Sequence, residues 1–149
     1  MNGWTRILAA VQVDSSSAEV LAETARLAEW SGAEVHLVHV FETPGYDGPA
    51  ELVPVQGQVP QEGLGSWRSA RAMATMMDTL QARGVRVAKG LMRRGIIEEE
   101  ILSLARHGGF DLVVIGNHHP SRLERTLAGD VAGVLLNRCP CPLLVVPHT

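Results

Sequence analysis

Two histidines and two cysteines in the last third of the chain are the side chains that most resemble a metal site. His118 and His119 are adjacent, and a single residue separates Cys139 from Cys141. Structural zinc sites use Cys-x2-Cys spacings, usually in two pairs, and this sequence has no second cysteine pair. We therefore predict no metal site. The loop between the cysteines is also too short for a good disulfide, which fits a reducing compartment.

No arrangement typical of an enzyme active site stands out. The serines at positions 15–17 follow an expected strand without a Gly-x-Ser-x-Gly elbow, so we interpret them as helix caps. The Gly-x4-Gly-Lys-[ST] loop is missing, and the one lysine, Lys89, falls in an expected strand. Glu98, Glu99 and Glu100 are neighbours on an expected helix and face different directions. The sequence therefore predicts that the protein is not an enzyme.

Length and composition fit one ordinary globular domain over residues 1–149, with 46% hydrophobic residues and a net charge of −3. Twelve of the 13 basic residues are arginines scattered along the chain, a pattern that argues against nucleic-acid binding. The longest stretch without a charged residue, 139–149, is far shorter than the about 20 residues that span a membrane. We interpret the apolar residues 7–13 as a strand rather than a signal peptide, and we expect a cytoplasmic protein.

The pattern of apolar residues predicts alternating strands and helices. Strands are expected where short apolar runs are buried on both faces, and helices where apolar residues recur every three or four positions. The expected strands are residues 6–13, 35–41, 85–91, 111–116 and 143–146, and the expected helices are residues 18 to near 32, 68–83, 96–107 and 130–137. Between residues 42 and 66, closely spaced prolines and glycines predict a long loop.

This order of elements predicts an α/β fold with a five-stranded, parallel, doubly wound sheet and helices on both faces. In such folds, ligands bind beyond the carboxyl ends of the strands, near the point where the strand order reverses. Those ends lie at residues 12–14, 40–42 and 116–122. The sequence therefore places a candidate ligand site in these three segments.

A long and specific pattern occupies the last third of the chain. It reads Asp-Leu-Val-Val-Ile-Gly from Asp111, Gly-Asp-Val-Ala from Gly129, and Cys-Pro-Cys-Pro-Leu-Leu-Val-Val-Pro from Cys139. This pattern resembles the universal stress protein family, the UspA-type domain. The resemblance extends over the whole chain, including the long middle loop and a turn at Gly95. It implies a Rossmann-like fold of the adenine nucleotide alpha hydrolase type and a homodimer with a role in stress resistance.

Nucleotide-binding members of the family carry the motif G-x2-G-x9-G-[ST] in this region. Gly116 and Gly129 keep the spacing, but His119 stands at the second glycine and Asp130 at the Ser or Thr. Glycines let backbone N–H groups approach phosphate, so the bulk of His119 is unfavourable. Asp130 would repel a triphosphate, and a positive charge on Arg122 or a protonated His119 would offset only part of that repulsion.

A third departure concerns the end of the first strand, where nucleotide-binding members have an acidic residue. An ungapped count from Gly32 places Gln12, Val13 and Asp14 there, and a shift of two residues would give Asp14 the acidic position. The candidate ligand-contacting residues are therefore Gln12, Val40, Gly116, His119, Arg122, Gly129, Asp130 and Val131.

The resemblance implies a stress-response regulator, and the departures from the motif predict that it is non-catalytic, with a degraded ATP-binding loop and no bound cofactor. The alternative is an adenine-nucleotide-binding regulator of the same family, which takes ATP or a ligand such as AMP that lacks the triphosphate. A nucleotide hydrolase ranks last, because no general base is evident. Protein partners are expected, but the sequence does not identify them.

The last strand is the expected dimer contact, because it is apolar at every position. If it lies at the edge of the sheet, it pairs antiparallel with the same strand of a second copy across a two-fold axis, as the resemblance implies. The other interpretation is a central strand, buried on both sides. The residues of this strand are Leu143, Leu144, Val145 and Val146.

Overall fold

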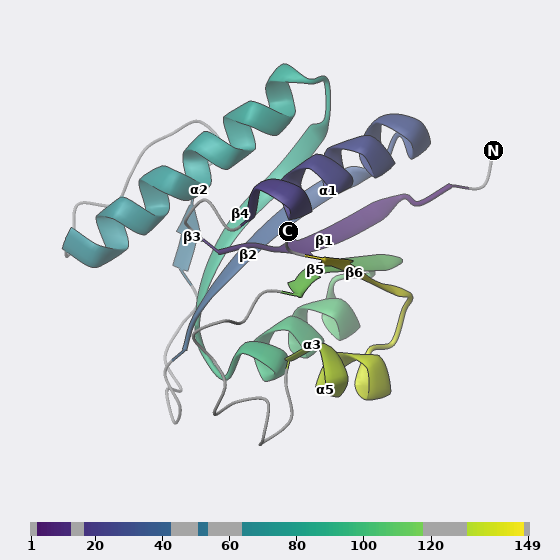
Figure 1. The fold of residues 1–149 in the computed structure, drawn as a ribbon. Helices are drawn as coiled ribbons and strands as arrows, with labels where there is room; N and C mark the ends of the chain where they lie inside the picture. Colours follow the sequence, from purple (N-terminus) through teal and green to yellow (C-terminus); the bar gives the residue numbers. More distant parts are fainter. Residues whose placement is uncertain (1–2, 13–16, 43–50, 54–63, 118–130, 148–149) are drawn as a thin grey trace.

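The computed structural model describes residues 3–12, 17–42, 51–53, 64–117 and 131–147. These residues form one sheet in the order β3-β4-β2-β1-β5-β6, with helices on both sides (Figure 1). The strands are β1 (Arg6–Ala10), β2 (Glu34–Glu42), β3 (Glu51–Val53), β4 (Arg86–Gly95), β5 (Leu112–Asn117) and β6 (Leu143–Pro147). The helices are α1 (Ala18–Ser31), α2 (Leu64–Ala82), α3 (Ile97–His107) and α5 (Val131–Arg138).

The predicted five parallel strands and the doubly wound arrangement are confirmed. Strands β4, β2, β1, β5 and β6 pair in parallel throughout. Helices α1 and α2 cover one face of the sheet, and α3 and α5 cover the other (Figure 1). Strand β6 lies at one edge of the sheet, so the interpretation of a central last strand is wrong.

Three expected boundaries were wrong. Within the expected loop of residues 42–66, β3 pairs antiparallel with β4, and α2 already begins at Leu64; residues 43–50 and 54–63 lie outside the described part. Strand β4 continues to Gly95 rather than ending at Leu91, because its backbone keeps pairing with β2 even where the side chains become polar. Strand β1 ends at Ala10 rather than at residue 13.

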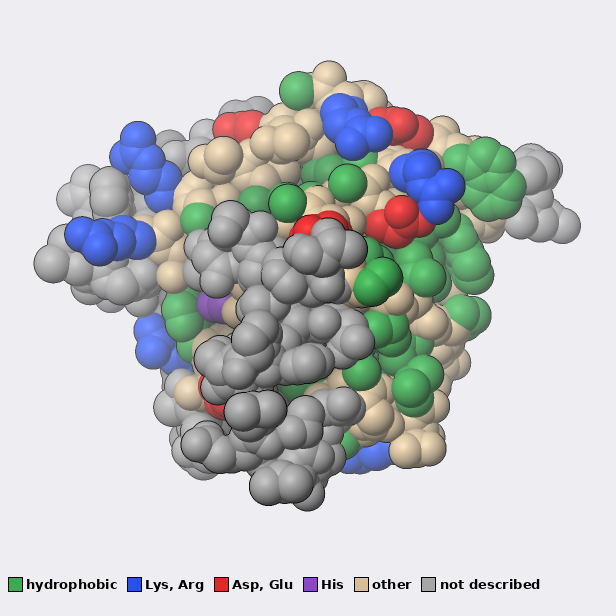
Figure 2. Space-filling model, in the orientation of Figure 1, with side chains coloured by type: hydrophobic (Ala, Val, Ile, Leu, Met, Phe, Trp, Pro, Cys, Tyr) green, Lys and Arg blue, Asp and Glu red, His purple; other side chains and the backbone are tan. Residues whose placement is uncertain are grey.

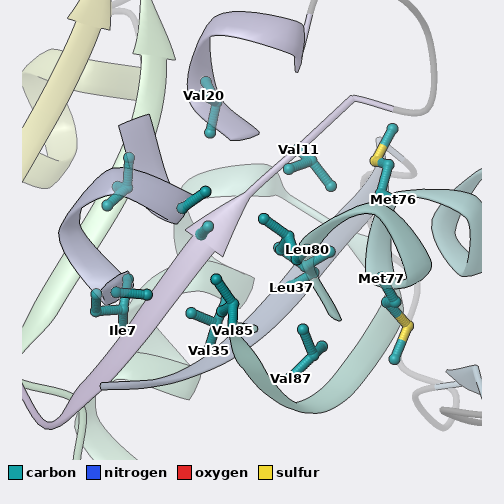
Figure 3. Packing of buried hydrophobic residues seen from close by; sticks show 14 of the residues in the cluster. Ile7, Val11, Val20, Val35, Leu37, Met76, Met77, Leu80, Val85 and Val87 are labelled. Carbon is teal, nitrogen blue, oxygen red and sulfur yellow. The ribbon is translucent and has the colours of Figure 1, made fainter. Parts of the chain in front are cut away.

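The core has two halves, one on each face of the sheet. On the side of α1 and α2, Ile7 and Leu37 from the strands pack with Met77 and Leu80 from α2 (Figure 3). The flexible methionine side chains fill the space over Gly90, where a Cβ atom would lie 2.5 Å from the Met77 Sδ. On the other face, the buried residues include Leu8, Val38, Ile101, Leu102 and Leu135.

The ends of α1 and α3 carry residues that favour helix termination or complement the helix dipole. α1 ends at Gly32, whose positive φ of 75° suits glycine, and the Gly32 N–H donates to the Ala28 carbonyl. α3 begins with three glutamates and ends with Arg106 and His107, which places opposite charges at the favourable ends. The predicted ends of these helices therefore agree with the structure to within one residue.

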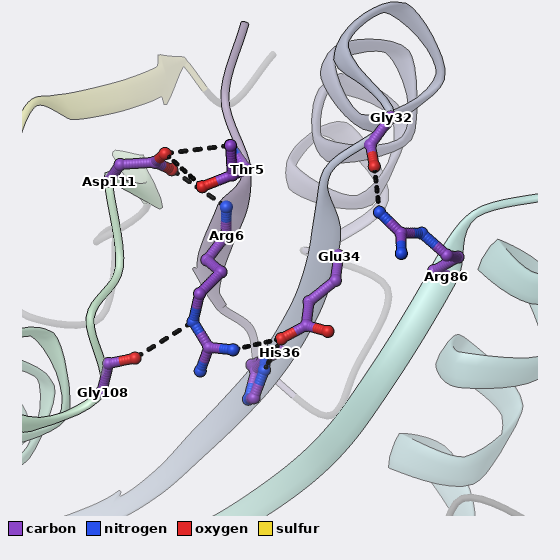
Figure 4. Close-up of polar contacts among 8 residues, drawn as sticks. All are labelled: Thr5, Arg6, Gly32, Glu34, His36, Arg86, Gly108 and Asp111. Atoms are coloured by element: carbon purple, nitrogen blue, oxygen red, sulfur yellow. Dashed lines mark hydrogen bonds and ion pairs between the residues drawn. The ribbon is translucent and has the colours of Figure 1, made fainter.

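Asp111 joins the amino ends of β1 and β5 (Figure 4). Its carboxylate accepts the Thr5 N–H at 2.9 Å, the Thr5 hydroxyl at 2.7 Å and the Arg6 N–H at 3.0 Å. Partial burial raises the pKa of Asp111, but the hydrogen bonds from Thr5 and Arg6 outweigh it and hold the pKa below its ordinary value. The ionised form therefore ties the two strands together.

Arg6 extends this amino-end network toward β2. Its Nε donates to the Gly108 carbonyl at 3.1 Å, its guanidinium pairs with Glu34, and it lies over the Phe110 ring. Glu34 also contacts the His36 Nε2 at 3.1 Å, and this hydrogen bond lowers the pKa of Glu34. Burial lowers the pKa of His36, so the imidazole is neutral at pH 7 and serves packing against Phe110.

Replacement of Asp111 by alanine is expected to lower the free energy of unfolding by about 1–3 kcal/mol, because three donors lose a charged acceptor. Asp78→Ala is the matched control, since Asp78 is exposed on α2 and should change stability little. Urea unfolding of both variants measures the difference. Equal effects in the two variants would contradict the proposed role of Asp111.

The Asp111 contribution is also expected to depend on pH. A carboxylate with a lowered pKa stabilises the protein above the unfolded pKa of about 4, and this stabilisation is lost as the pH falls through the folded pKa. The stability gap between the wild type and Asp111→Asn should therefore shrink below about pH 4. A gap that stays constant from neutral to acidic pH would show that the charge is not responsible.

Candidate functional site

The carboxyl ends of β2, β1 and β5 meet at one edge of the sheet, opposite the amino-end network. The chain passes from β1 outward to β2 and β4, and then places β5 and β6 on the other side of β1. The strand order therefore reverses between β1 and β5. This is the position where open α/β sheets bind ligands, and three of the predicted residues, Gln12, Val40 and Gly116, lie at the ends of these strands.

Hydrogen bonds fix the chain just beyond β1. The Val11 N–H donates to the Val38 carbonyl at 2.8 Å, and the Val11 carbonyl accepts the Nδ1–H of His39 at 2.9 Å. The Gln12 N–H donates to the hydroxyl of buried Ser17 at 2.6 Å. Ser17 occupies the N-cap position of α1, but its hydroxyl makes no capping hydrogen bond to the helix. It therefore anchors the turn that carries Gln12, a role that the capping interpretation missed.

Gly116 brings β5 close to α1. A Cβ atom at this position would lie 3.0 Å from the Val20 Cγ2, a distance tighter than most real contacts. The glycine therefore lets the end of β5 lie against the first turns of α1. This packing gives Gly116 a structural reason that is separate from any contact with a phosphate.

Two arginines at the end of β4 were missed as part of this edge. Arg93 pairs in register with Val40, and Arg94 pairs with Phe41. Arg93 Nη1 lies 3.5 Å from Glu100 Oε1, while its buried Nε has no hydrogen-bond partner among the described residues. The expected strand ended at Leu91, so neither arginine was assigned to this end of the sheet.

The Arg94 side chain takes part in an aromatic stack on the opposite face of the sheet from Val40. Its guanidinium carbon lies 5.4 Å from the centre of the Phe41 ring, and Phe41 packs edge-on against His39 at 4.7 Å. His39 in turn holds the Val11 carbonyl. The Arg94 guanidinium, the Phe41 ring and the His39 ring therefore form a continuous row of contacts that ends at the Val11 carbonyl.

The remaining predicted site residues divide into two groups. Val131 is the first residue of α5, is partly exposed, and packs against the core cluster that contains Val40. The others, His119, Arg122, Gly129 and Asp130, lie outside the described residues. The described part of this end of the sheet therefore offers the Gln12 amide, the partly exposed side chain of Val131 above buried core residues that include Val40, and nearby arginine charge.

The two cysteines lie away from this edge, before β6. Their Sγ atoms are 3.9 Å apart, and both thiols are free and partly exposed. Burial raises the pKa of Cys141 to about 12, with further contributions from Cys139 and Asp111. No group of three or more histidine, cysteine, aspartate or glutamate side chains in the described part of the chain is placed to hold a metal ion.

A family model described as the universal stress protein family matches residues 3–147. The chain belongs to this family. Universal stress protein A homolog 1 from Coxiella burnetii is 26% identical over 144 residues, covering 96% of each chain. The recognition made from the Gly-Asp-Val-Ala and Cys-Pro-Leu-Leu-Val-Val segments is therefore confirmed.

Solved structures of universal stress proteins share the fold. One, in complex with cAMP, has a TM-score of 0.71 at 17% identity and covers 99% of this chain and 100% of its own. Another, from Archaeoglobus fulgidus in complex with dAMP, has a TM-score of 0.63 at 17% identity and covers 95% and 97%. At these identities the likeness establishes the Rossmann-like fold. No helix among the described residues is long and apolar enough to cross a bilayer.

The close approach of β5 to α1 predicts a coupled pair of substitutions. Gly116→Ala should destabilise the protein, because the added methyl is crowded against the Val20 side chain. The same substitution in a Val20→Ala background should cost measurably less, because the space is then available. Thermal or urea unfolding of the four proteins gives the coupling energy. A coupling of zero would contradict this account of Gly116.

Proposed function

We propose that this chain is a non-catalytic regulatory universal stress protein that binds MgATP weakly at most and acts as a homodimer through protein partners. The observation that carries the first part is the pair of departures in the nucleotide motif, His119 and Asp130. A phosphate loop depends on backbone N–H groups that side-chain bulk obstructs, and Asp130 adds like-charge repulsion. Gln12 in place of an acidic residue gives additional, weaker support.

A second candidate is a receptor for a nucleoside monophosphate at the carboxyl edge of β2, β1 and β5. Two of the solved relatives were determined with cAMP and with dAMP, and each of these ligands carries one phosphate. A monophosphate brings less negative charge toward Asp130 than a triphosphate does. The partly exposed side chain of Val131 and the amide of Gln12 suit a base and a ribose, and Arg93 pairs in register with Val40 beneath them.

Isothermal titration of the purified protein with MgATP and with AMP separates these candidates. We expect no micromolar binding of MgATP by the wild type. The double variant His119→Gly, Asp130→Ser should bind MgATP at least about tenfold more tightly, because it restores backbone access and removes the repelling charge. His118→Gly is the matched control, since it changes a neighbouring histidine outside the motif.

Each outcome of this titration has one meaning. Micromolar MgATP binding by the wild type would overturn the degraded-loop proposal. Micromolar AMP binding without MgATP binding would establish the second candidate instead. An unchanged double variant would show that these two positions do not form the phosphate loop.

The homodimer proposal rests on the edge position of β6. Strand β5 pairs with one side of β6, and among the described residues no strand pairs with the other side. Hydrophobic side chains gather on the right of the face in Figure 2, in the region of β6 and α5 in Figure 1. Leu136 of α5 is also 66% exposed. An apolar edge without charged side chains favours antiparallel pairing with a second copy.

Val145→Lys should convert the dimer into a folded monomer, because Val145 is only partly buried and a charge at an open edge opposes strand pairing. Light scattering measures the mass, and circular dichroism checks the fold. Thr79→Lys, at an exposed position of α2, is the control and should remain dimeric. A monomeric wild type, or a Val145→Lys protein that remains dimeric, would contradict the proposed interface.

A further inference from the structure

The Cys139–Pro140–Cys141 segment places two thiols side by side at the start of the edge strand. Cys139 follows α5 directly, and its N–H donates to the Leu135 carbonyl at 2.8 Å. Only Pro142 lies between Cys141 and the start of β6. Both side chains pack partly against the core on the face of α3 and α5, yet both keep exposed surface. The backbone on either side is therefore held by regular structure, and the sulfur atoms meet at 3.9 Å.

This separation fits a shared metal ion better than it fits a disulfide. A disulfide needs the sulfurs to close to about 2.05 Å, within a ring that contains only one intervening residue. Two thiolates with metal–sulfur bonds of about 2.3 Å, in contrast, lie 3.9 Å apart when the angle at the metal is about 116°. That angle lies between the tetrahedral and trigonal values. This separation, which is that of a thiol–thiol hydrogen bond, is therefore compatible with two ligands of one ion.

In contrast to the sequence-based expectation of no metal site, we propose that Cys139 and Cys141 together bind one soft monovalent cation, Cu(I), with a third position open to an external ligand. Thiolate sulfur is the ligand type that selects Cu(I). Structural Zn²⁺ takes four protein ligands, and the described residues offer no third side chain to complete such a site. Binding releases the two thiol protons to solvent and forms two copper–sulfur bonds, and no electron is transferred.

The surroundings of the pair keep the Cys141 thiol protonated when the site is empty, because burial and the nearby Asp111 carboxylate both disfavour its thiolate. The carboxylate of Asp111 acts electrostatically on Cys141, while its own oxygens are occupied by Thr5 and Arg6. It therefore contributes negative charge without being a ligand. An incoming cation therefore displaces the Cys141 proton. The exposed part of each sulfur leaves access for an incoming ion and for the third ligand.

Anaerobic titration of the full chain with Cu(I), in competition with the chromophoric chelator bicinchoninate, tests this proposal. We expect one equivalent of Cu(I) per chain and a thiolate-to-copper charge-transfer band in the ultraviolet. Cys139→Ser and Cys141→Ser should each weaken binding by at least about tenfold and reduce that band. His107→Ala is the control for adventitious imidazole binding, since His107 is exposed, and it should bind Cu(I) like the wild type.

Circular dichroism of each variant checks that the fold is retained, and Cys139→Ala and Cys141→Ala replace the serine variants if either of those unfolds. Retention of tight Cu(I) binding in both single cysteine variants would overturn the proposal. So would binding too weak to compete with the chelator, or displacement of Cu(I) by an equal concentration of Zn²⁺.

Discussion

The hydrogen bonds from Thr5 and Arg6 to Asp111 join two central strands of the sheet at their amino ends. They fix β1 against β5 at the amino ends, and Arg6 carries the same network across to Glu34 on β2. Three strands are thereby aligned from one end. The opposite end of the same strands carries Gln12, Val40 and Gly116. The network that stabilises the fold and the candidate site thus lie at opposite ends of the strands.

Much of this architecture could be predicted because buried parallel strands leave a plain signal. Runs such as residues 112–115 are apolar at every position, and glycines end the helices between them. β3 was missed because a three-residue strand among prolines is held by pairing with β4 and not by a pattern of its own. The site was less predictable: Gln12 and Val40 lie at the expected edge, but polar Arg93 was assigned to a loop because tertiary pairing, not hydrophobicity, extends β4.

The two outer edges of the sheet, at β3 and at β6, differ in how they are covered. At one edge, β3 runs antiparallel along β4 and covers three of its residues, from Gly90 to Met92. At the other edge, β6 presents apolar side chains with no strand beyond it among the described residues. The cysteine pair sits at the beginning of this open edge. A partner strand on β6 and an ion on the cysteines would therefore be neighbours. We expect the affinity of one to depend on the presence of the other.

The pairing of β1 with β5 also sets the order in which the chain can be completed during synthesis. Thr5 and Asp111 are 106 positions apart, so β1 emerges from the ribosome long before the strand that flanks it. At a translation rate of about 5–20 residues per second, β1 waits for roughly 5–20 s. During that time it can pair with β2, but its other side stays open to foreign strands. The nascent chain is thus vulnerable to aggregation at what becomes a central, buried strand of the finished protein.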